Sequence, residues 1–247
     1  MNLKKLFVAL GIASSLGLFS ACDMMSNFYD DTLDSAPSSD TQSGQNSSQQ
    51  TDSVTRTDST GQKQVIQVKS GQYYIDASSY TKWVYINFHS DSLCITTSDI
   101  SLDNLKETGA PQAWDIAQHR YDVKTNQACV FMTDYHSISD LEAAGLPADA
   151  AWVADEYSDN AITVDMSHML EGYLVYAPGN RNTEAGRWLH VDTSSMPPSY
   201  TLHDNVMLYR FDDGTYAAIQ LVNFMSTDKY QIKGWMTVNY QYPIFVK

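Results

Sequence analysis

Short apolar runs bounded by polar residues recur along the chain from about Val65 onward. Most contain β-branched and aromatic residues, and clusters of Ser, Asp and Lys separate them, a pattern typical of antiparallel strands joined by turns. The sequence predicts such strands over Tyr73–Asp76, Trp83–Asn87, Leu93–Thr96, Trp114–Val123, Ala128–Met132, Ala161–Asp165, Leu174–Tyr176, Trp188–Val191 and Tyr200–Leu202.

The clearest alternation lies near the C-terminus. Val206–Phe211 and Thr215–Phe224 flank Asp212-Asp213-Gly214, whose glycine can adopt the positive φ angle that tight hairpin turns require. In the last predicted strand, alternate residues from Gly234 to Tyr242 share one face, as expected for a half-buried antiparallel strand.

Helix signals are few. Ser139–Glu142 matches a capping box, which Gly145 would end after about two turns, and Ser101–Glu107 predicts one more turn ended by Gly109. No segment repeats with the period of a solenoid or a propeller. The sequence therefore predicts an all-β, mostly antiparallel, single-domain fold with one or two short helical turns.

The N-terminus has a different pattern. Two lysines precede the apolar stretch Leu6–Phe19, which is too short to span a membrane and is typical of a secretory signal peptide. Phe19-Ser20-Ala21-Cys22 resembles a bacterial lipobox, so residues 1–21 are predicted to be a lipoprotein signal peptide and Cys22 to carry the fatty-acyl (palmitate) anchor. An ordinary signal peptide ending near a cysteine is the alternative. Residues 22–64 are polar and acidic, which predicts a disordered tether before a folded domain over 65–247.

Composition excludes several function classes. With 29 acidic and 15 basic residues, the chain has a net charge of −14, which disfavours binding to nucleic acid or to anionic lipid through basic patches. The Walker, GxGxxG, HExxH, GxSxG and CxxC motifs are missing from the sequence. Scattered carboxylates such as Asp155, Glu156 and Asp159 are typical of a solvated surface, so we do not predict an enzyme, and a hydrolase is the weakest hypothesis.

Histidines and cysteines do not form a metal-binding pattern. None of the six histidines pairs at zinc-ligand spacing. His119 alternates with apolar residues and is expected to fix an inner strand through hydrogen bonds. Cys94 and Cys129 lie on separate predicted strands, where either a disulfide or two buried thiols would fit.

Two methionines differ from the others in their setting. Met196 lies in a polar loop stiffened by Pro197 and Pro198, and Met169 follows a polar segment after a strand end. A thioether on such a loop is available to an aromatic ligand, a partner surface or a soft metal centre. The alternative is that each side chain folds back over the edge of the sandwich. Three further methionines lie on apolar strand faces and are expected to fill the core: Met207, Met225 and Met236.

The segment Trp114–Val123, WDIAQHRYDV, resembles the most characteristic string of the HmuY family of haem-binding lipoproteins. The resemblance continues in order along the chain and spans about Gln72 to Pro243. It is carried further by Tyr74–Tyr85, Gly186–Leu189, Pro198–Leu202 and Thr237–Pro243.

This resemblance implies a β domain that holds haem (iron protoporphyrin IX), bound non-covalently, between two hairpin-like fingers with two axial side-chain ligands. Thr193 stands where the family has a histidine, and Met196 resembles the methionine of relatives that use methionine ligands. Met169 is expected as the first ligand and Met196 as the second. His168 is the reserve for the first ligand, and His190 is a further candidate on the second finger.

The same resemblance implies further site residues and partners. Tyr173, Tyr176 and Trp188 are expected to line the haem site, and Arg181 or Arg187 to face the propionates. The haem would pass to a TonB-dependent outer-membrane receptor from a protein anchored by lipid at the outer membrane, on the cell surface. The alternative is a surface adhesin or glycan-binding module of the same fold that binds no haem and uses exposed Tyr and Trp side chains.

Overall fold

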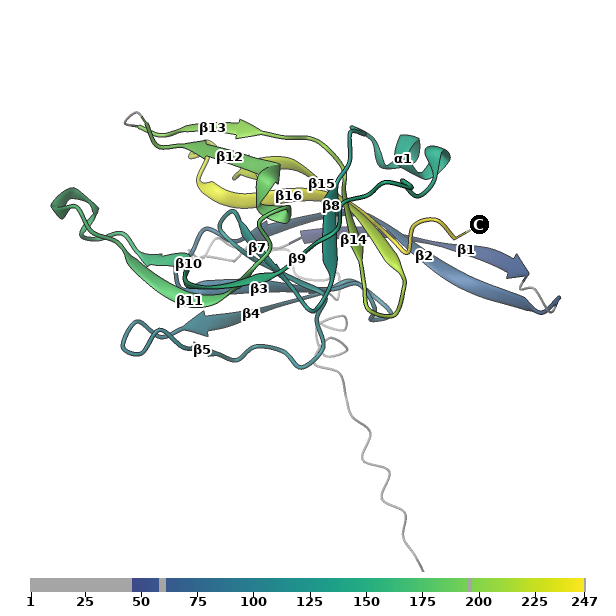
Figure 1. Cartoon of the computed structure of the whole chain (residues 1–247), viewed down its shortest axis with the longest axis horizontal. Coiled ribbons are helices and arrows are strands. Elements are labelled where there is room, and N and C mark those ends of the chain that lie inside the picture. Colours follow the sequence, from purple (N-terminus) through teal and green to yellow (C-terminus); the bar gives the residue numbers. More distant parts are fainter. Residues whose placement is uncertain (1–45, 58–60, 195–196, 247) are drawn as a thin grey trace, which may run out of the picture. The chain divides into compact units, whose positions relative to one another are not determined.

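Strands dominate the computed structural model, which describes residues 46–57, 61–194 and 197–246 (Figure 1). Within these residues, the larger sheet has the strand order β1-β2-β16-β15-β14-β8-β9, with every neighbouring pair antiparallel. Its strands are β1 (Asn46–Thr57), β2 (Lys63–Asp76), β8 (Cys129–Met132), β9 (Val153–Ala154), β14 (Met207–Arg210), β15 (Tyr216–Met225) and β16 (Lys233–Tyr242).

A smaller antiparallel sheet has the order β5-β4-β3-β6-β7. Its strands are β3 (Lys82–Asn87), β4 (Cys94–Ile100), β5 (Glu107–Thr108), β6 (Ile116–His119) and β7 (Asp122–Thr125). The main core forms between the two sheets, because strands of both contribute fully buried side chains to one cluster. It includes Tyr73, Ile75, Val84, Ile86, Ile116, Met207, Tyr209, Ile219 and Val238. Each such side chain stabilises the fold by about 1.5–3 kcal/mol through burial.

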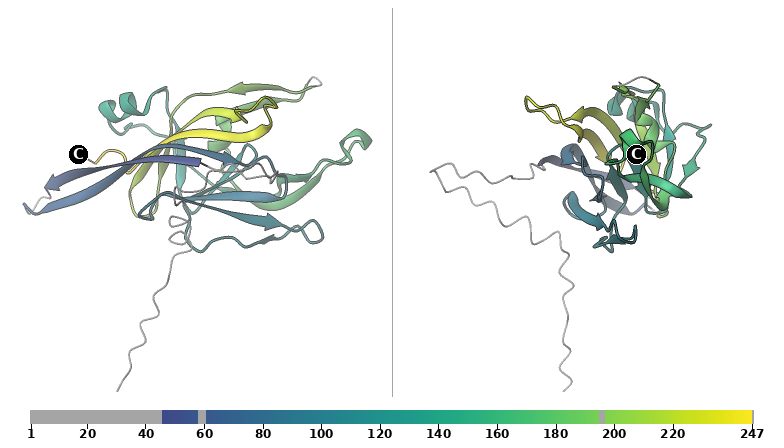
Figure 2. Two further views of the ribbon diagram at one scale, coloured as in Figure 1. Left: turned by 180° about the vertical axis from the view of Figure 1, so that it is seen from behind. Right: turned by 90° about the vertical axis from the view of Figure 1, so that its left-hand side faces the viewer.

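Two separate hairpins extend from this body in the same direction (Figures 1 and 2). The first finger consists of β10 (Glu156–Asp165), the 3₁₀ turn η1 (Met169–Glu171) and β11 (Val175–Arg181). The second finger consists of β12 (Leu189–Asp192) and β13 (Ser199–Leu202), and it follows directly on the 3₁₀ turn η2 (Ala185–Trp188). The β1–β2 hairpin extends from the opposite side of the body.

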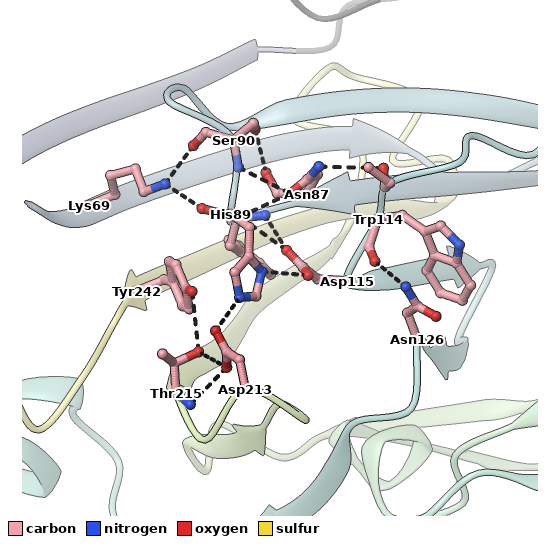
Figure 3. Close-up of polar contacts among 12 residues, drawn as sticks. Lys69, Asn87, His89, Ser90, Trp114, Asp115, Asn126, Asp213, Thr215 and Tyr242 are labelled. Carbon is pink, nitrogen blue, oxygen red and sulfur yellow. Dashed lines mark hydrogen bonds and ion pairs between the residues drawn. The ribbon is translucent and has the colours of Figure 1, made fainter. Parts of the chain in front are cut away.

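A histidine bridge connects the loop after β3 to the turn between β14 and β15 (Figure 3). His89 contacts Asp115 through Nδ1 (2.7 Å) and Asp213 through Nε2 (3.2 Å). The hydrogen bond to Asp115 is the main reason that the pKa of His89 is raised. Asp213 belongs to the predicted Asp-Asp-Gly turn, in which Gly214 adopts a φ angle of 83°.

The predicted all-β, antiparallel fold is confirmed, and so is one short helix. Helix α1 spans Ile138–Ala144. It begins two residues earlier than the predicted cap at Ser139 implies, because Ser137 is the N-cap and accepts a hydrogen bond from the Asp140 N–H. Gly145 ends the helix as expected. The predicted turn over Ser101–Glu107 is a single hydrogen-bonded turn, after which the chain enters β5 instead of continuing to Gly109.

The predicted strand Trp114–Val123 is wrong, because the segment folds into the β6–β7 hairpin. Arg120 turns the chain with a φ angle of 51°. Its guanidinium donates to the Ser78 carbonyl (2.5 Å) and lies 4.0 Å from the Tyr80 ring centroid, and these contacts hold the residue in a conformation that sequence patterns do not reveal.

The predicted domain start at residue 65 also needs correction. Strand β1 lies inside the stretch 22–64 that was expected to be disordered, and it pairs with β2 in an antiparallel register from Asn46↔Tyr74 to Thr57↔Lys63. Backbone pairing with an existing strand requires little burial of side chains, which explains how so polar a segment forms a strand. Residues 1–45, including the predicted signal peptide and Cys22, lie outside the described residues.

Two smaller sequence questions are settled by the described residues. Cys129 is a free, partly exposed thiol, so the Cys94–Cys129 disulfide does not form and the expectation of two buried thiols is also wrong. No helix in the described ranges is long and apolar enough to cross a membrane.

Candidate functional site

The tip of the first finger is shaped by local hydrogen bonds. Asp165 accepts from the Ser167 N–H (2.8 Å) and the Ser167 hydroxyl (3.0 Å), which turns the chain at the end of β10. The short η1 turn follows, and Gly172 ends it with a left-handed φ angle of 89°. A residue with a Cβ would adopt this angle only at a cost, so the glycine fixes where the chain returns toward β11.

This tip exposes large apolar side chains. Leu170 is 93% exposed and Tyr173 52% exposed, while Met169 (39%) and Tyr176 (38%) are nearly as accessible. A patch of exposed apolar side chains often marks a binding surface, because removing apolar surface from water on binding is favourable in free energy. The thioether predicted as the first ligand therefore lies on an accessible apolar tip.

His168 lies at the same tip with a fixed ring. The ring stacks on Tyr173, with centroids 4.8 Å apart and planes inclined by 14°, and Nδ1 contacts the Glu171 carboxylate at 3.0 Å. Its other ring nitrogen, Nε2, has no hydrogen-bond partner among the described residues. His168 and Met169 are thus both presented by the tip, as neighbours in sequence.

The second finger packs on the body along its length. Tyr200 stacks on Phe224 (centroids 5.6 Å apart) and meets Tyr121 edge-on at 5.7 Å. Val191 also packs against the main core cluster. Met196, the predicted second ligand, lies outside the described residues, as does Ser195 beside it.

A cavity of about 450 Å³ lies where the two fingers begin. It is lined by side chains from β7, β8, β11, η2, β12 and the segment after β13. Those that carry its chemistry are Asp122, Met132, Arg181, Arg187, His190 and His203.

Both arginines of this cavity have a carboxylate partner. Arg187 is paired with Glu184, with Nη1 2.9 Å and 3.0 Å from its two carboxylate oxygens. Arg181 lies 3.7 Å from Asp122. Burial raises the pKa of Asp122 to about 6, although the positive charges of Arg181 and Arg120 oppose that rise. Each guanidinium has more N–H groups than these contacts use, and N–H groups of this kind bind carboxylates well.

The structure separates the predicted site residues into two groups. Met169 and His168 lie at the first tip, and His190 lies on β12 at the finger base, where it lines the cavity with Arg181 and Arg187. The sequence did not indicate Met132 and His203, because they come from distant segments that only the fold brings to this cavity. Within the described residues, no group of three His, Cys, Asp or Glu side chains could hold a metal ion.

One predicted lining residue is wrong. Trp188 is fully buried, and its indole N–H donates to the Tyr121 carbonyl at 2.9 Å, so it supports the second finger from inside. The expectation for His119 is confirmed: it is 1% exposed and its Nε2 contacts the Tyr80 carbonyl at 2.9 Å. Burial lowers the pKa of His119 to about 4, so the ring is neutral at physiological pH.

Solved structures include close relatives of this chain. A Bacteroides fragilis protein assigned as a lipoprotein is 48% identical, with a TM-score of 0.64 over 70% of this chain and 89% of its own. A Bacteroides vulgatus protein assigned as an HmuY-like haem-binding protein is 40% identical, with a TM-score of 0.62 over 71% and 92%. The apo HmuY analogue of Tannerella forsythia shares the fold, with 24% identity, a TM-score of 0.55 and coverage of 71% and 96%.

The comparison with curated proteins found no match. The sequence profile of the HmuY protein family, in contrast, matches residues 79–240, which include the smaller sheet, both fingers and the larger sheet apart from β1, β2 and the end of β16. This match covers more than half of the chain, and the Bacteroides relatives agree with it in sequence and in fold. The chain therefore belongs to the HmuY family.

Proposed function

We propose that this protein binds haem between its two fingers. The observation that carries the proposal is the pairing of two features on the same fingers: an exposed apolar tip with a thioether, and a base cavity with two arginines. Membership of the HmuY family and the relative assigned as haem-binding support it.

The residues present fit the chemistry of haem. The porphyrin is a large apolar plate with two carboxylates on one edge and an iron at its centre. Leu170, Tyr173 and Tyr176 would cover apolar surface, whose burial supplies much of the affinity. Arg181 and Arg187 would hold the two propionates. The chain has a net charge of −14, so it needs local positive charge to bind a dianionic ligand.

Met169 and Met196 are the proposed axial ligands. Thioethers are soft, uncharged ligands and favour ferrous over ferric iron. Weaker thioether ligation also suits a protein that must release what it binds. His168 beside Met169 and His190 at the finger base are the alternative ligands, since each has an accessible imidazole.

The proposal extends to location and partner. Lipid on Cys22 would anchor the protein at the outer membrane, on the cell surface, and the bound haem would pass to a TonB-dependent receptor. Ligand fingers that extend from one side of the body would be open to such a receptor.

Haem titration tests this function. The chain from residue 23 onward, which lacks the lipidation site, is mixed with haemin and recorded by visible spectroscopy before and after reduction by dithionite. We expect a sharpened Soret band and, on reduction, split α and β bands. A spectrum identical to that of free haemin in both states would reject haem binding.

Single substitutions then assign the ligands. We expect Met169→Ala and Met196→Ala each to weaken ferrous binding at least about tenfold. Leu170→Ala is the matched control, because it removes an apolar side chain at the same tip and leaves both thioethers. If His168→Ala or His190→Ala abolishes the reduced spectrum while the methionine variants keep it, the ligand assignment is wrong and haem binding stands.

A further inference from the structure

A second cavity, of about 570 Å³, lies along the turn between β7 and β8 and is bounded by β9 and β11. It shares no lining residue with the cavity at the finger base. Its polar and aromatic lining includes Trp114, Lys124, Asn126, Gln127, Asp155 and Asn180. Trp114 opens the family string, yet the haem site makes no use of it.

Lys124 is held in this cavity by aromatic rings. Its Nζ lies 4.3 Å from the ring centroid of Trp83, 4.9 Å from that of Tyr85 and 5.6 Å from that of Trp114. It also donates to Glu107 at 2.6 Å. The other oxygen of Glu107 accepts from the Tyr85 and Ser98 hydroxyls, so that carboxylate is satisfied. The ammonium has two further N–H groups without a partner among the described residues.

Several other polar groups around the cavity lack partners within the described ranges. These are the indole N–H of Trp114 and the carboxamides of Gln127 and Asn180. Asn126 is fixed by its donation to the Trp114 carbonyl (2.9 Å; Figure 3), which leaves its amide oxygen without a partner among the described residues. The lining therefore combines donors and acceptors with an aromatic ring, and Ala128, Ala154 and Gly179 are its small apolar members.

The charges select the class of ligand. The positive charge of Lys124 is balanced by Glu107, and Asp155 adds a negative charge that its hydrogen bonds from Thr125 and Asn182 hold in place. An anion would meet net repulsion here, in a chain that is already strongly acidic. A neutral ligand with many hydroxyls and one apolar ring face would satisfy the free amides, the ammonium and the indole together.

We infer that this cavity is a binding site for neutral saccharides, separate from the haem site between the fingers. The sugar ring would lie against Trp114, and its hydroxyls would bond to Lys124, Asn126, Gln127 and Asn180. A surface protein with this site would carry two independent ligands, one at the fingers and one beside the β7–β8 turn.

An array of defined glycans tests the inference. The chain from residue 23 onward is applied to neutral glycans built from hexoses, N-acetylhexosamines and fucose, and to their sialylated and sulfated counterparts. We expect retention on neutral glycans, followed by quenching or enhancement of tryptophan fluorescence on titration with the neutral glycan that is bound best. Retention on acidic glycans alone, or on none, would overturn the inference.

Substitutions locate the site. Gln127→Ala and Asn180→Ala change side chains without partners, so both should fold, and each is expected to weaken glycan binding at least about fivefold. Tyr230→Ala is the control, since it removes a 69%-exposed aromatic ring outside the cavity. Unchanged glycan binding in the Gln127→Ala/Asn180→Ala double variant would also reject the site. Haemin titration of the same variants should match that of the unaltered chain. Loss of glycan binding can then be distinguished from loss of haem binding.

Discussion

The two fingers are alike in topology and differ in how they are supported. The first finger is buried only along the half of β10 that leads to the tip, where Ile162 and Val164 pack in a satellite cluster with residues of the smaller sheet. Its strand register shifts twice, and the chain beyond Asp165 carries the exposed apolar tip. The second finger pairs regularly from Leu189↔Leu202 to Asp192↔Ser199 and lies on the main core.

Because of this difference, the two fingers would contribute to ligand binding in different ways. The position of the second finger is set by the same contacts that stabilise the domain, so it cannot move without loss of core packing. The tip of the first finger is held by a few exposed hydrogen bonds and one stacked ring pair, which can open at little cost in free energy. We infer that the first finger adapts to a ligand that meets a second finger already in place.

Acid should disturb the support of the second finger most strongly. His119 lies next to the Arg120–Tyr121 turn on which Trp188 and Tyr200 rest. Because its pKa is lowered from 6.5 to about 4, the unfolded chain binds a proton that the folded chain does not between those values. The stability that the neutral ring provides is complete above pH 6.5 and decreases as pH falls toward 4, by up to about 3 kcal/mol.

Urea unfolding at pH 7 and at pH 4.5 measures this loss. In His119→Gln, the difference in free energy of unfolding between the two pH values should shrink, because the substituted side chain does not titrate. His136→Gln is the control, since that histidine is exposed and pairs only with Asp204. Equal pH dependence in the unaltered chain and in His119→Gln would show that His119 is not the responsible group.

Stability should also distinguish the two fingers. Tyr200→Ala removes a ring that packs on Phe224 and Tyr121, and we expect it to lower the free energy of unfolding by about 2 kcal/mol. Tyr173→Ala removes an equal ring that is 52% exposed, and its effect should stay within about 0.5 kcal/mol. Denaturant titration of both variants measures the difference. Comparable losses would contradict the division between a supported second finger and a free tip on the first finger.

Much of the fold could be predicted because alternation records which face of a strand is buried. Strand β1 was missed because its polar side chains are exposed along the edge of the sheet, so its pairing has no hydrophobic signature. Trp188 was predicted to begin a strand and line the haem site, but it lies in the 3₁₀ turn η2, where its indole points into the core.

Site residues could be predicted only where local sequence reports exposure. Met169 stood out because polar residues precede it, and it lies on an exposed tip as expected. The base cavity could not be predicted, since Asp122, Arg181 and His203 come from three distant segments. Pairing of Asp122 with Arg181 depends on the contact between β7 and β11, which no local pattern encodes.

The smallest expected effect tests the base cavity, where the two fingers meet, and it depends on the proposed haem function. Asp122 places a negative charge beside the arginine that would hold a propionate. Because its pKa is raised to about 6, it is mostly ionised at pH 7 and becomes neutral as pH falls below 6. Asp122→Asn should therefore strengthen haem binding at pH 7 by roughly threefold, a gain that added salt reduces.

The advantage of the variant should vanish at pH 5, where the unaltered side chain is also neutral, and Asp204→Asn, outside the cavity, should change nothing. Weaker binding by Asp122→Asn would mean that the carboxylate serves to orient Arg181, in which case the base of the fingers is as firmly preorganised as the second finger itself.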